Sequence, residues 1–191
     1  IKIATTHCGV TPIEADARDL PINDGTVDFL FSFHVFEHIP KVEQVYQEVE
    51  RVLATEGYGL IAQAWNCRPW TVKKLEQRPY SELTIAEKIG KFLIPIRNSL
   101  AFRFLLSIPK RLLRELKAWK GGPVDVDYLT LTPRFDLWDR FEHISDDDAF
   151  VSMDAHSAII YFKSRGYMIL SHPSFLRRIF CRGEAVVVKK V

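Results

Sequence analysis

Residues 15–65 read ADARDLPINDGTVDFLFSFHVFEHIPKVEQVYQEVERVLATEGYGLIAQAW, and this stretch decides the fold. It holds two apolar runs, residues 27–32 and 59–65, that suit buried parallel strands in length and composition. Between them, residues 42–53 repeat apolar side chains at helical spacing, which predicts an amphipathic helix. A helix that joins two parallel strands makes a right-handed crossover. The stretch therefore predicts a strand–helix–strand unit of an α/β sheet.

Small, polar and aromatic residues follow each predicted strand of this unit. Open parallel sheets bind ligands at the carboxyl ends of their strands, so we expect these residues at one rim. The rim residues are Asp16 and Ala17 after a short apolar run, Ser32, Phe33 and His34 after the next strand, and Trp65 and Asn66 after the last.

The stretch resembles the class I S-adenosylmethionine-dependent methyltransferases, in particular the branch that methylates small molecules. The resemblance rests on the order and spacing of D-A-R-D-L-P (16–21), V-D (27–28), H-I-P (38–40), E-V-E-R-V-L (48–53) and E-G-Y-G (56–59). It covers about a third of the chain. It implies a doubly wound, Rossmann-like α/β sheet and methyl transfer from S-adenosyl-L-methionine to a small or lipophilic acceptor.

The resemblance also implies how the cofactor is held. Asp16 would accept a hydrogen bond from the adenine amino group, and the backbone amide of Ala17 would donate to a ring nitrogen. The backbone of residues 32–34 would hold the methionine end, and His38 would touch the cofactor or organise its loop. The alternative for Asp16 is a cap on the turn that follows it.

The glycine-rich loop with which the family fold begins has no counterpart here, because the first two glycines are the isolated Gly9 and Gly25. We therefore expect an N-terminally truncated fold, with 1–191 as a single methyltransferase-like domain and residues 10–15 as the family's third strand. The strand at 27–32 would then lack a neighbour. Unpaired buried backbone groups cost about 1–3 kcal/mol each, so these residues alone would need a substitute strand, such as one from another copy.

Residues 68–120 are strongly basic, with thirteen Lys or Arg and four Glu. They lie where the family inserts its variable, substrate-covering region, so we expect a helical insert at 68–123, with Pro109 dividing its last helix in two. Three interpretations of the amphipathic segment 99–120 stay open: a lid over the substrate, a peripheral contact with an anionic membrane, or a homodimer or partner surface.

The C-terminal third predicts the end of the sheet. Ser145 or an aspartate after it would begin a helix that runs to about Arg165, with Gly166 as its stop. Residues 167–170 and 184–190 read as the last two strands, and the resemblance implies that the final strand is antiparallel.

Methyl transfer needs alignment, a dry pocket and in some cases a base. His143 is the candidate base or substrate contact, with His156 and His172 as alternatives, although a single histidine is more often structural. The aromatic and amide side chains that we predict as substrate walls are Trp65, Asn66, Tyr128 and Trp138.

Two other functions remain open at this point. His34, Glu37 and His38 fit the H-x-x-E-H pattern of a zinc hydrolase, but that motif needs a continuous helix and here it follows a strand-like run. We therefore expect no metal site. The second alternative is a methyltransferase-like protein that no longer catalyses and serves as a binding or scaffold subunit.

Composition narrows the possible partners and cellular locations of the protein. A net charge of +2 over 191 residues gives no reason to expect nucleic acid, and no apolar run approaches the roughly 20 residues that cross a bilayer. Three widely spaced cysteines predict free thiols in a reducing compartment. We therefore expect a cytoplasmic protein, peripheral at a membrane if the insert contacts lipid, with a small-molecule or lipid-like substrate as its partner.

Overall fold

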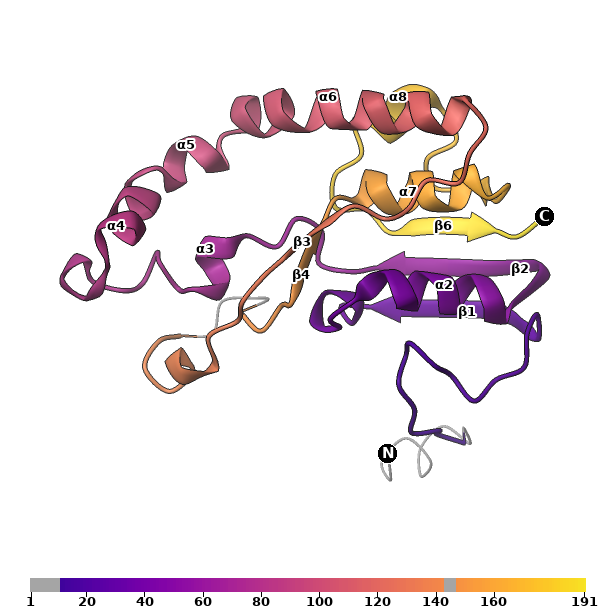
Figure 1. Ribbon diagram of the computed structural model, residues 1–191, viewed down its shortest axis with the longest axis horizontal. Helices are drawn as coiled ribbons and strands as arrows, with labels where there is room; N and C mark the ends of the chain where they lie inside the picture. The colour runs from indigo at the N-terminus through magenta and orange to yellow at the C-terminus, as the bar shows by residue number, and fades with distance from the viewer. Residues whose placement is uncertain (1–10, 143–146) are drawn as a thin grey trace.

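The computed structural model describes residues 11–142 and 147–191, which form a four-stranded mixed sheet with helices packed in layers beside it (Figure 1). The strand order is β1-β2-β6-β5, with β1 at Val27–Phe33, β2 at Leu53–Ala62, β5 at Met168–Ile169 and β6 at Val186–Lys189. Strands β1 and β2 are parallel, and β6 is antiparallel to both β2 and β5. The predicted α/β class and the antiparallel last strand are therefore confirmed.

Helix α2 (Val42–Val52) makes the crossover from β1 to β2, as the apolar spacing predicts. Its buried residues Val42, Val45, Tyr46, Val49 and Val52 form one face that packs on the sheet. The irregular first part of β2, where its pairing with β1 shifts register, requires a glycine at position 57. A Cβ there would lie 2.8 Å from the Ala54 carbonyl oxygen and 2.9 Å from that of Val27, so any larger residue would push the two strands apart.

Helix α7 (Ala155–Ser164) packs on the same sheet face as α2, and α6 (Leu100–Trp119) lies on its other side (Figure 1). The Tyr46 ring of α2 lies 5.5 Å from the Tyr161 ring of α7, centroid to centroid. Because α7 is covered by the sheet on one side and by α6 on the other, its residues 155–162 are all buried.

A buried ionic cluster fixes α6 and α8 (Phe175–Ile179) to α7. Glu115 of α6 accepts hydrogen bonds from Lys163 Nζ at 2.6 Å and from Arg178 Nε at 2.5 Å. Its carboxylate also lies 3.8 Å from the fully buried ring of His156. Helix α6 is thus held by charged groups on its inner side.

The opposite face of the sheet is open at β1. Phe29, Phe31 and Phe33 point to that face and are 57%, 63% and 54% exposed. Strand β1 lies at the edge of the sheet that the described residues form.

Residues 11–15 do not form the expected third strand. The described part of this segment has no strand pairing beyond an isolated bridge between Asp16 and Asp19, and Ile13 is exposed. A strand is stable only beside a partner, and no described segment lies next to this one as a ladder neighbour.

Two helix predictions were also wrong. Helix α7 begins after Asp154 and not near Ser145, because β4 (Val151–Met153) precedes it and pairs with β3 (Tyr128–Thr130); Ser145 itself lies outside the described residues. Helix α6 continues through Pro109. The proline removes one backbone hydrogen bond, while the buried charges of Arg111, Arg114 and Glu115 anchor the second half of the helix.

The basic insert begins after β2 with short helices. These are α3 (Pro69–Val72), the 3-10 turn η2 (Tyr80–Glu82), α4 (Ile85–Phe92) and α5 (Ile94–Asn98), ahead of α6. Thr84 caps α4 in a capping box with Glu87. Two further 3-10 turns are η1 (Phe36–His38), directly after β1, and η3 (Phe135–Leu137), within the β3–β4 connection.

Candidate active site

The carboxyl ends of β1 and β2 are fastened side by side. The His34 backbone N–H donates to the Ala62 carbonyl at 2.8 Å, and His34 itself has a φ of +50° that turns the chain away from β1. Glu37 is fully buried, and its Oε1 accepts from the Ala64 backbone N–H at 3.1 Å. The chain segments leaving the two strands are therefore held together at one rim, as the crossover predicts.

The H-x-x-E-H residues do not lie on a continuous helix. Glu37 and His38 belong to the single 3-10 turn η1, and His34 directly follows the last residue of β1. His34 Nδ1 and His38 Nε2 both face Glu37 Oε1, at 3.5 and 3.8 Å, so the carboxylate sits between the rings. Within residues 11–142 and 147–191, no group of three His, Cys, Asp or Glu could hold a metal ion. The helix that a zinc hydrolase motif needs is absent from this segment.

Asp16 lies in a tight loop and is paired with its neighbour Arg18. Arg18 Nη2 donates to Asp16 Oδ2 at 2.6 Å and Arg18 Nε to Oδ1 at 2.9 Å, and these bonds lower the pKa of Asp16 to about 2. Arg18 Nη1 also reaches the Pro40 carbonyl at 3.4 Å. The Asp16 loop is thereby tied to the segment after η1, and its carboxylate is ionised at neutral pH with its side chain 48% exposed.

Two motif residues of α2 hold this loop in place. Glu48 Oε1 accepts from the Leu20 N–H at 2.6 Å, while Arg51 donates to the carbonyls of Leu20 at 3.0 Å and Ile22 at 2.8 Å. Glu48 and Arg51 also pair with each other. The sequence analysis did not assign them a role. Their spacing of three residues on a helix, after a Leu-Pro loop, was the available signal.

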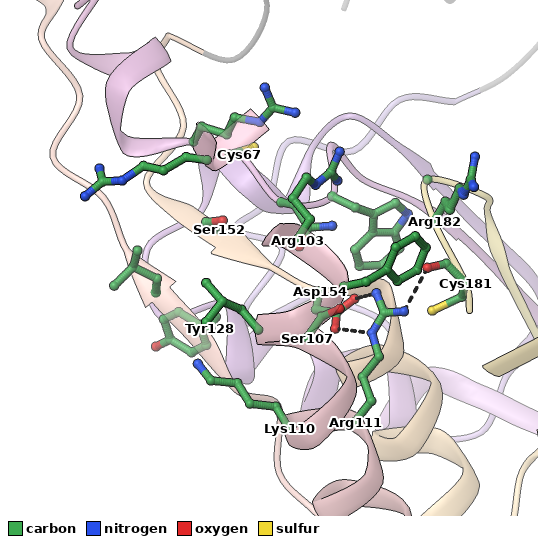
Figure 2. A pocket seen from close by; sticks show the side chains of 18 of the residues that line it. Cys67, Arg103, Ser107, Lys110, Arg111, Tyr128, Ser152, Asp154, Cys181 and Arg182 are labelled. Atoms are coloured by element: carbon green, nitrogen blue, oxygen red, sulfur yellow. Dashed lines mark hydrogen bonds and ion pairs between the residues drawn. The ribbon is translucent and has the colours of Figure 1, made fainter. Parts of the chain in front are cut away.

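A pocket of about 940 Å³ opens beside the end of β2, between α6, the β3–β4 pair and the segment before β6 (Figure 2). Three of the predicted substrate residues, Trp65, Asn66 and Tyr128, line it. Trp138 does not, because its ring packs edge-on against Phe135 at 5.1 Å in the β3–β4 connection. This volume is typical of a small-molecule site.

Tyr128 and Trp65, the two aromatic residues predicted as substrate walls that line the pocket, already have hydrogen-bond partners for their polar atoms. Tyr128 OH donates to Glu43 Oε2 at 2.6 Å, and this bond raises the pKa of Tyr128 to about 12. Trp65 Nε1 donates to the Glu184 carbonyl at 3.1 Å. Both residues therefore offer ring surface to a ligand, and Tyr128 is a poor base at neutral pH.

An ion pair forms the floor of the pocket. Asp154, the N-cap of α7, accepts two bonds from Arg111, Nη2 to Oδ1 at 2.7 Å and Nε to Oδ2 at 2.8 Å (Figure 2). Burial alone would raise the pKa of Asp154, but the bonds from Arg111 outweigh it and lower the pKa. Arg111 also donates to the carbonyls of Ile179 and Cys181, so the floor is rigidly connected to the chain after α8.

The predicted cofactor residues are not part of this pocket wall. The lining does not include Asp16, Ala17, Ser32, Phe33, His34 or His38. Ala17 packs against the core, Phe33 stacks beside Phe31 at 5.9 Å, and His38 Nδ1 lies 3.3 Å from Asp148 Oδ1. His143 lies outside the described residues. The assignments of cofactor and substrate residues stay predictions.

Comparison with known proteins adds family information for the first part of the chain. Residues 1–61 match a family model described as a methyltransferase domain. Sterol methyltransferase-like 3 of Botryococcus braunii is 47% identical over 47 residues, a match that covers 25% of this chain and 12% of that protein. Sterol methyltransferase-like 1 of the same organism is 42% identical over 53 residues, covering 28% and 14% respectively.

One solved structure overlaps most of the chain at low similarity. It is a complex between the Haloferax volcanii Trm112 methyltransferase activator and a candidate methyltransferase; the overlap covers 92% of this chain and 59% of that chain, at 15% identity and a TM-score of 0.31. At that score the overlap carries no conclusion. Residues 1–61 are therefore similar to methyltransferase domains, and the parallel strand pair bordered by an antiparallel last strand is consistent with the α/β fold expected of them.

Proposed function

We propose that this protein transfers a methyl group from S-adenosylmethionine to a small or lipophilic acceptor bound in the pocket beside β2. The observation that carries the proposal is the position of that pocket. Its Trp65–Asn66 wall follows β2 directly, and β2 ends beside His34, where the family binds the methionine part of the cofactor. A donor at the β1 rim and an acceptor in the pocket would lie next to each other.

The donor set at the rim suits an adenosine group. Asp16 is ionised and half exposed, and a carboxylate has more acceptor positions than Arg18 occupies, so it has room for one further donor. When bound, S-adenosylmethionine supplies the activated methyl group. What is left to the protein is to align the acceptor and exclude water.

The pocket residues serve those two tasks. The rings of Trp65 and Tyr128 offer apolar surface that displaces water from the acceptor. The Arg111–Asp154 pair keeps the floor in one geometry, because both side chains are largely buried and doubly bonded. A reducing, cytoplasmic location belongs to the same proposal, and the burial of the Cys67 and Cys181 side chains is compatible with it.

Ligand-induced stabilisation tests the proposal. The full-length gene product should melt at a higher temperature with S-adenosylmethionine or S-adenosylhomocysteine, by about 2.7 kcal/mol of stability at a hundredfold excess over Kd. Methionine alone is the control and should give no comparable shift. An unchanged melting temperature at millimolar S-adenosylmethionine would contradict cofactor binding and with it the proposed reaction.

A further inference from the structure

The pocket wall contributed by α6 is positively charged. Seven basic side chains line the pocket against two acidic ones: Arg68, Arg97, Arg103, Lys110, Arg111, Arg114 and Arg182 against Asp127 and Asp154. The two acids are already engaged, since Asp154 pairs with Arg111 and Asp127 with Arg114. The remaining positive charge has to be balanced by water, ions or a ligand.

Three of these cations are free to bind something else. Within the described residues, the side chains of Arg103, Lys110 and Arg182 form no ion pair, and Figure 2 shows all three around the mouth of the pocket. Burial and the neighbouring charges of Arg68, Arg111 and Arg182 lower the pKa of Arg103. An anion placed among them would relieve that repulsion.

Much of the remaining lining is apolar. Leu100, Phe104 and Leu129 contribute hydrocarbon surface beside the rings of Trp65 and Trp70. A ligand that satisfies both parts of the lining has an apolar body and an anionic group, either carboxylate or phosphate. We propose that the pocket binds an amphiphilic anion of this kind as its methyl acceptor, which rests on the proposed function for the transfer step but not for the binding step.

Binding of simple amphiphiles without cofactor tests the anion preference. Decyl phosphate and decanoate should bind the full-length protein about tenfold more tightly than the neutral decyl glucoside, the order expected from a few exposed ion pairs, measured by titration calorimetry at low salt. Arg103→Gln with Arg182→Gln should remove the preference, while Lys88→Gln, which changes an exposed lysine of α4 outside the pocket lining, should keep it.

Two results would overturn the inference. Equal affinity for decyl glucoside and decyl phosphate would show that the cations select nothing. Equal affinity for inorganic phosphate and decyl phosphate would show that the apolar lining is not used. Because no cofactor is present, failure here is distinct from a failure of S-adenosylmethionine to stabilise the protein.

A second inference comes from the other side of α6, whose polarity is inverted. The buried residues of this helix are the charged Arg111, Arg114 and Glu115. Facing outward are Leu105, Leu113, Leu116 and Trp119, at 72%, 59%, 52% and 83% exposure. Surface helices normally bury such residues, and an exposed apolar face of this extent marks an interaction surface.

The charges on this outer face fit a membrane better than a second copy of the chain. Glu115 is the one acidic residue between positions 99 and 120, and it is buried, whereas Lys117 and Lys120 are exposed. A twofold dimer through this face would bring like charges together. Apolar side chains beside lysines are the composition of helices that lie on anionic lipid.

A groove of about 870 Å³ between α6 and α8 continues the same surface. Leu112, Leu116, Trp119 and Phe175 line it, and Leu176 of α8 is also exposed. No helix among the described residues is long and apolar enough to cross a bilayer, so the contact would be at the surface. We infer that the outer face of α6 and α8 docks on an anionic lipid surface.

Vesicle flotation tests this inference. The full-length protein should float with vesicles that contain phosphatidylserine and bind less to pure phosphatidylcholine vesicles. Lys117→Gln with Lys120→Gln should weaken binding by about fivefold per lysine. Trp119→Ser with Leu113→Ser should reduce it further, whereas Phe31→Ser, which removes an equally exposed ring on β1, should leave it unchanged.

Sedimentation velocity decides between lipid and a second copy. The inference is supported if the vesicle-binding variants sediment like the parent protein. It is overturned if the protein does not bind anionic vesicles. It is also overturned if the double variant Trp119→Ser with Leu113→Ser dissociates a dimer and leaves vesicle binding unaltered.

Discussion

Asp16 is the residue on which the predicted cofactor site most depends. Its carboxylate is ionised, because hydrogen bonds from Arg18 lower its pKa to about 2, and Arg18 fastens the loop to Pro40. Asp16→Ala should therefore weaken S-adenosylmethionine binding to the full-length protein by more than tenfold, as expected for loss of a hydrogen bond to a charged group, measured by calorimetry. Arg18→Ala keeps the carboxylate and should cost less. Unchanged affinity in Asp16→Ala would remove this residue from the site.

His156 should make stability depend on pH near neutrality. Burial lowers its pKa from the usual 6.5, although Glu115 opposes the shift. The unfolded chain then binds a proton more readily than the folded one, so the stability that neutral His156 contributes is present above pH 6.5 and is lost as the pH falls toward the lower folded pKa.

Urea unfolding across this range measures the effect. The free energy of unfolding should decrease between about pH 7.5 and pH 5.5, and His156→Gln should flatten that dependence. Asp154 and Glu115 also face this ring, but their pKa values are lowered, so they contribute only at more acidic pH. The same slope in parent and variant would show that His156 does not titrate as its burial implies.

The sequence indicated where some pocket residues lie, while their role as substrate contacts stays a prediction. Trp65 and Asn66 follow β2, and the structure brings them to one pocket with Tyr128. The cations Arg103, Lys110 and Arg182 were not identified as a cluster. The amphipathic pattern of α6 does not show which of its two faces is buried. In the structure the charged face is buried, because it forms ion pairs with α7 and α8.

At the scale of elements, α2 positions the Asp16 loop through Glu48 and Arg51. Arg51→Met removes the bonds to the Leu20 and Ile22 carbonyls and leaves Glu48 without its partner. We expect a loss of about 1–3 kcal/mol in the free energy of unfolding, with faster hydrogen exchange at the Leu20 amide. Arg177→Met, which changes an exposed arginine of α8, is the matched control.

The interpretation of Arg51 as a clamp makes a prediction that a general packing role does not. If Arg51→Met destabilised the protein while the Leu20 amide kept its parental protection, the residue would act through packing and the loop would be held by other contacts.

The elements that sequence predicted well are those with long, regular patterns. For α2, the spacing of the apolar residues and the turn residues at its ends predict the same bounds, and the structure confirms these bounds to within one residue. The three-residue strands β3 and β4 are too short for their pattern to be recognised. Because β4 was not predicted, the expected start of α7 was placed too early in the sequence. Pro109 was misleading because tertiary ion pairs, which no local pattern reveals, hold α6 together.

For the whole molecule, the two sides of the sheet differ sharply. One side carries α2 and α7 over a continuous core, as the α/β prediction requires. On the other side, the ring surfaces of Phe29, Phe31 and Phe33 are exposed along an edge strand whose outer backbone groups have no described partner. The sequence analysis anticipated this edge from the strands that the family places next to it.

An exposed, apolar edge strand is a site of strand pairing between chains, so the 191-residue chain should self-associate through β1. Burying one phenylalanine is worth about 1.5–3 kcal/mol, and Phe31→Ser should therefore raise the dissociation constant by at least about tenfold in sedimentation velocity. Leu113→Ser, on the outer face of α6, is the matched control, because it removes a similarly exposed apolar side chain far from the strand edge. The prediction is wrong if the sedimentation coefficient does not vary with protein concentration. It is also wrong if Leu113→Ser, and not Phe31→Ser, weakens the association, because β1 would then not be the edge through which copies pair. The outer face of α6 would then be the surface at which copies meet, and the assignment of that face to lipid would fall with it.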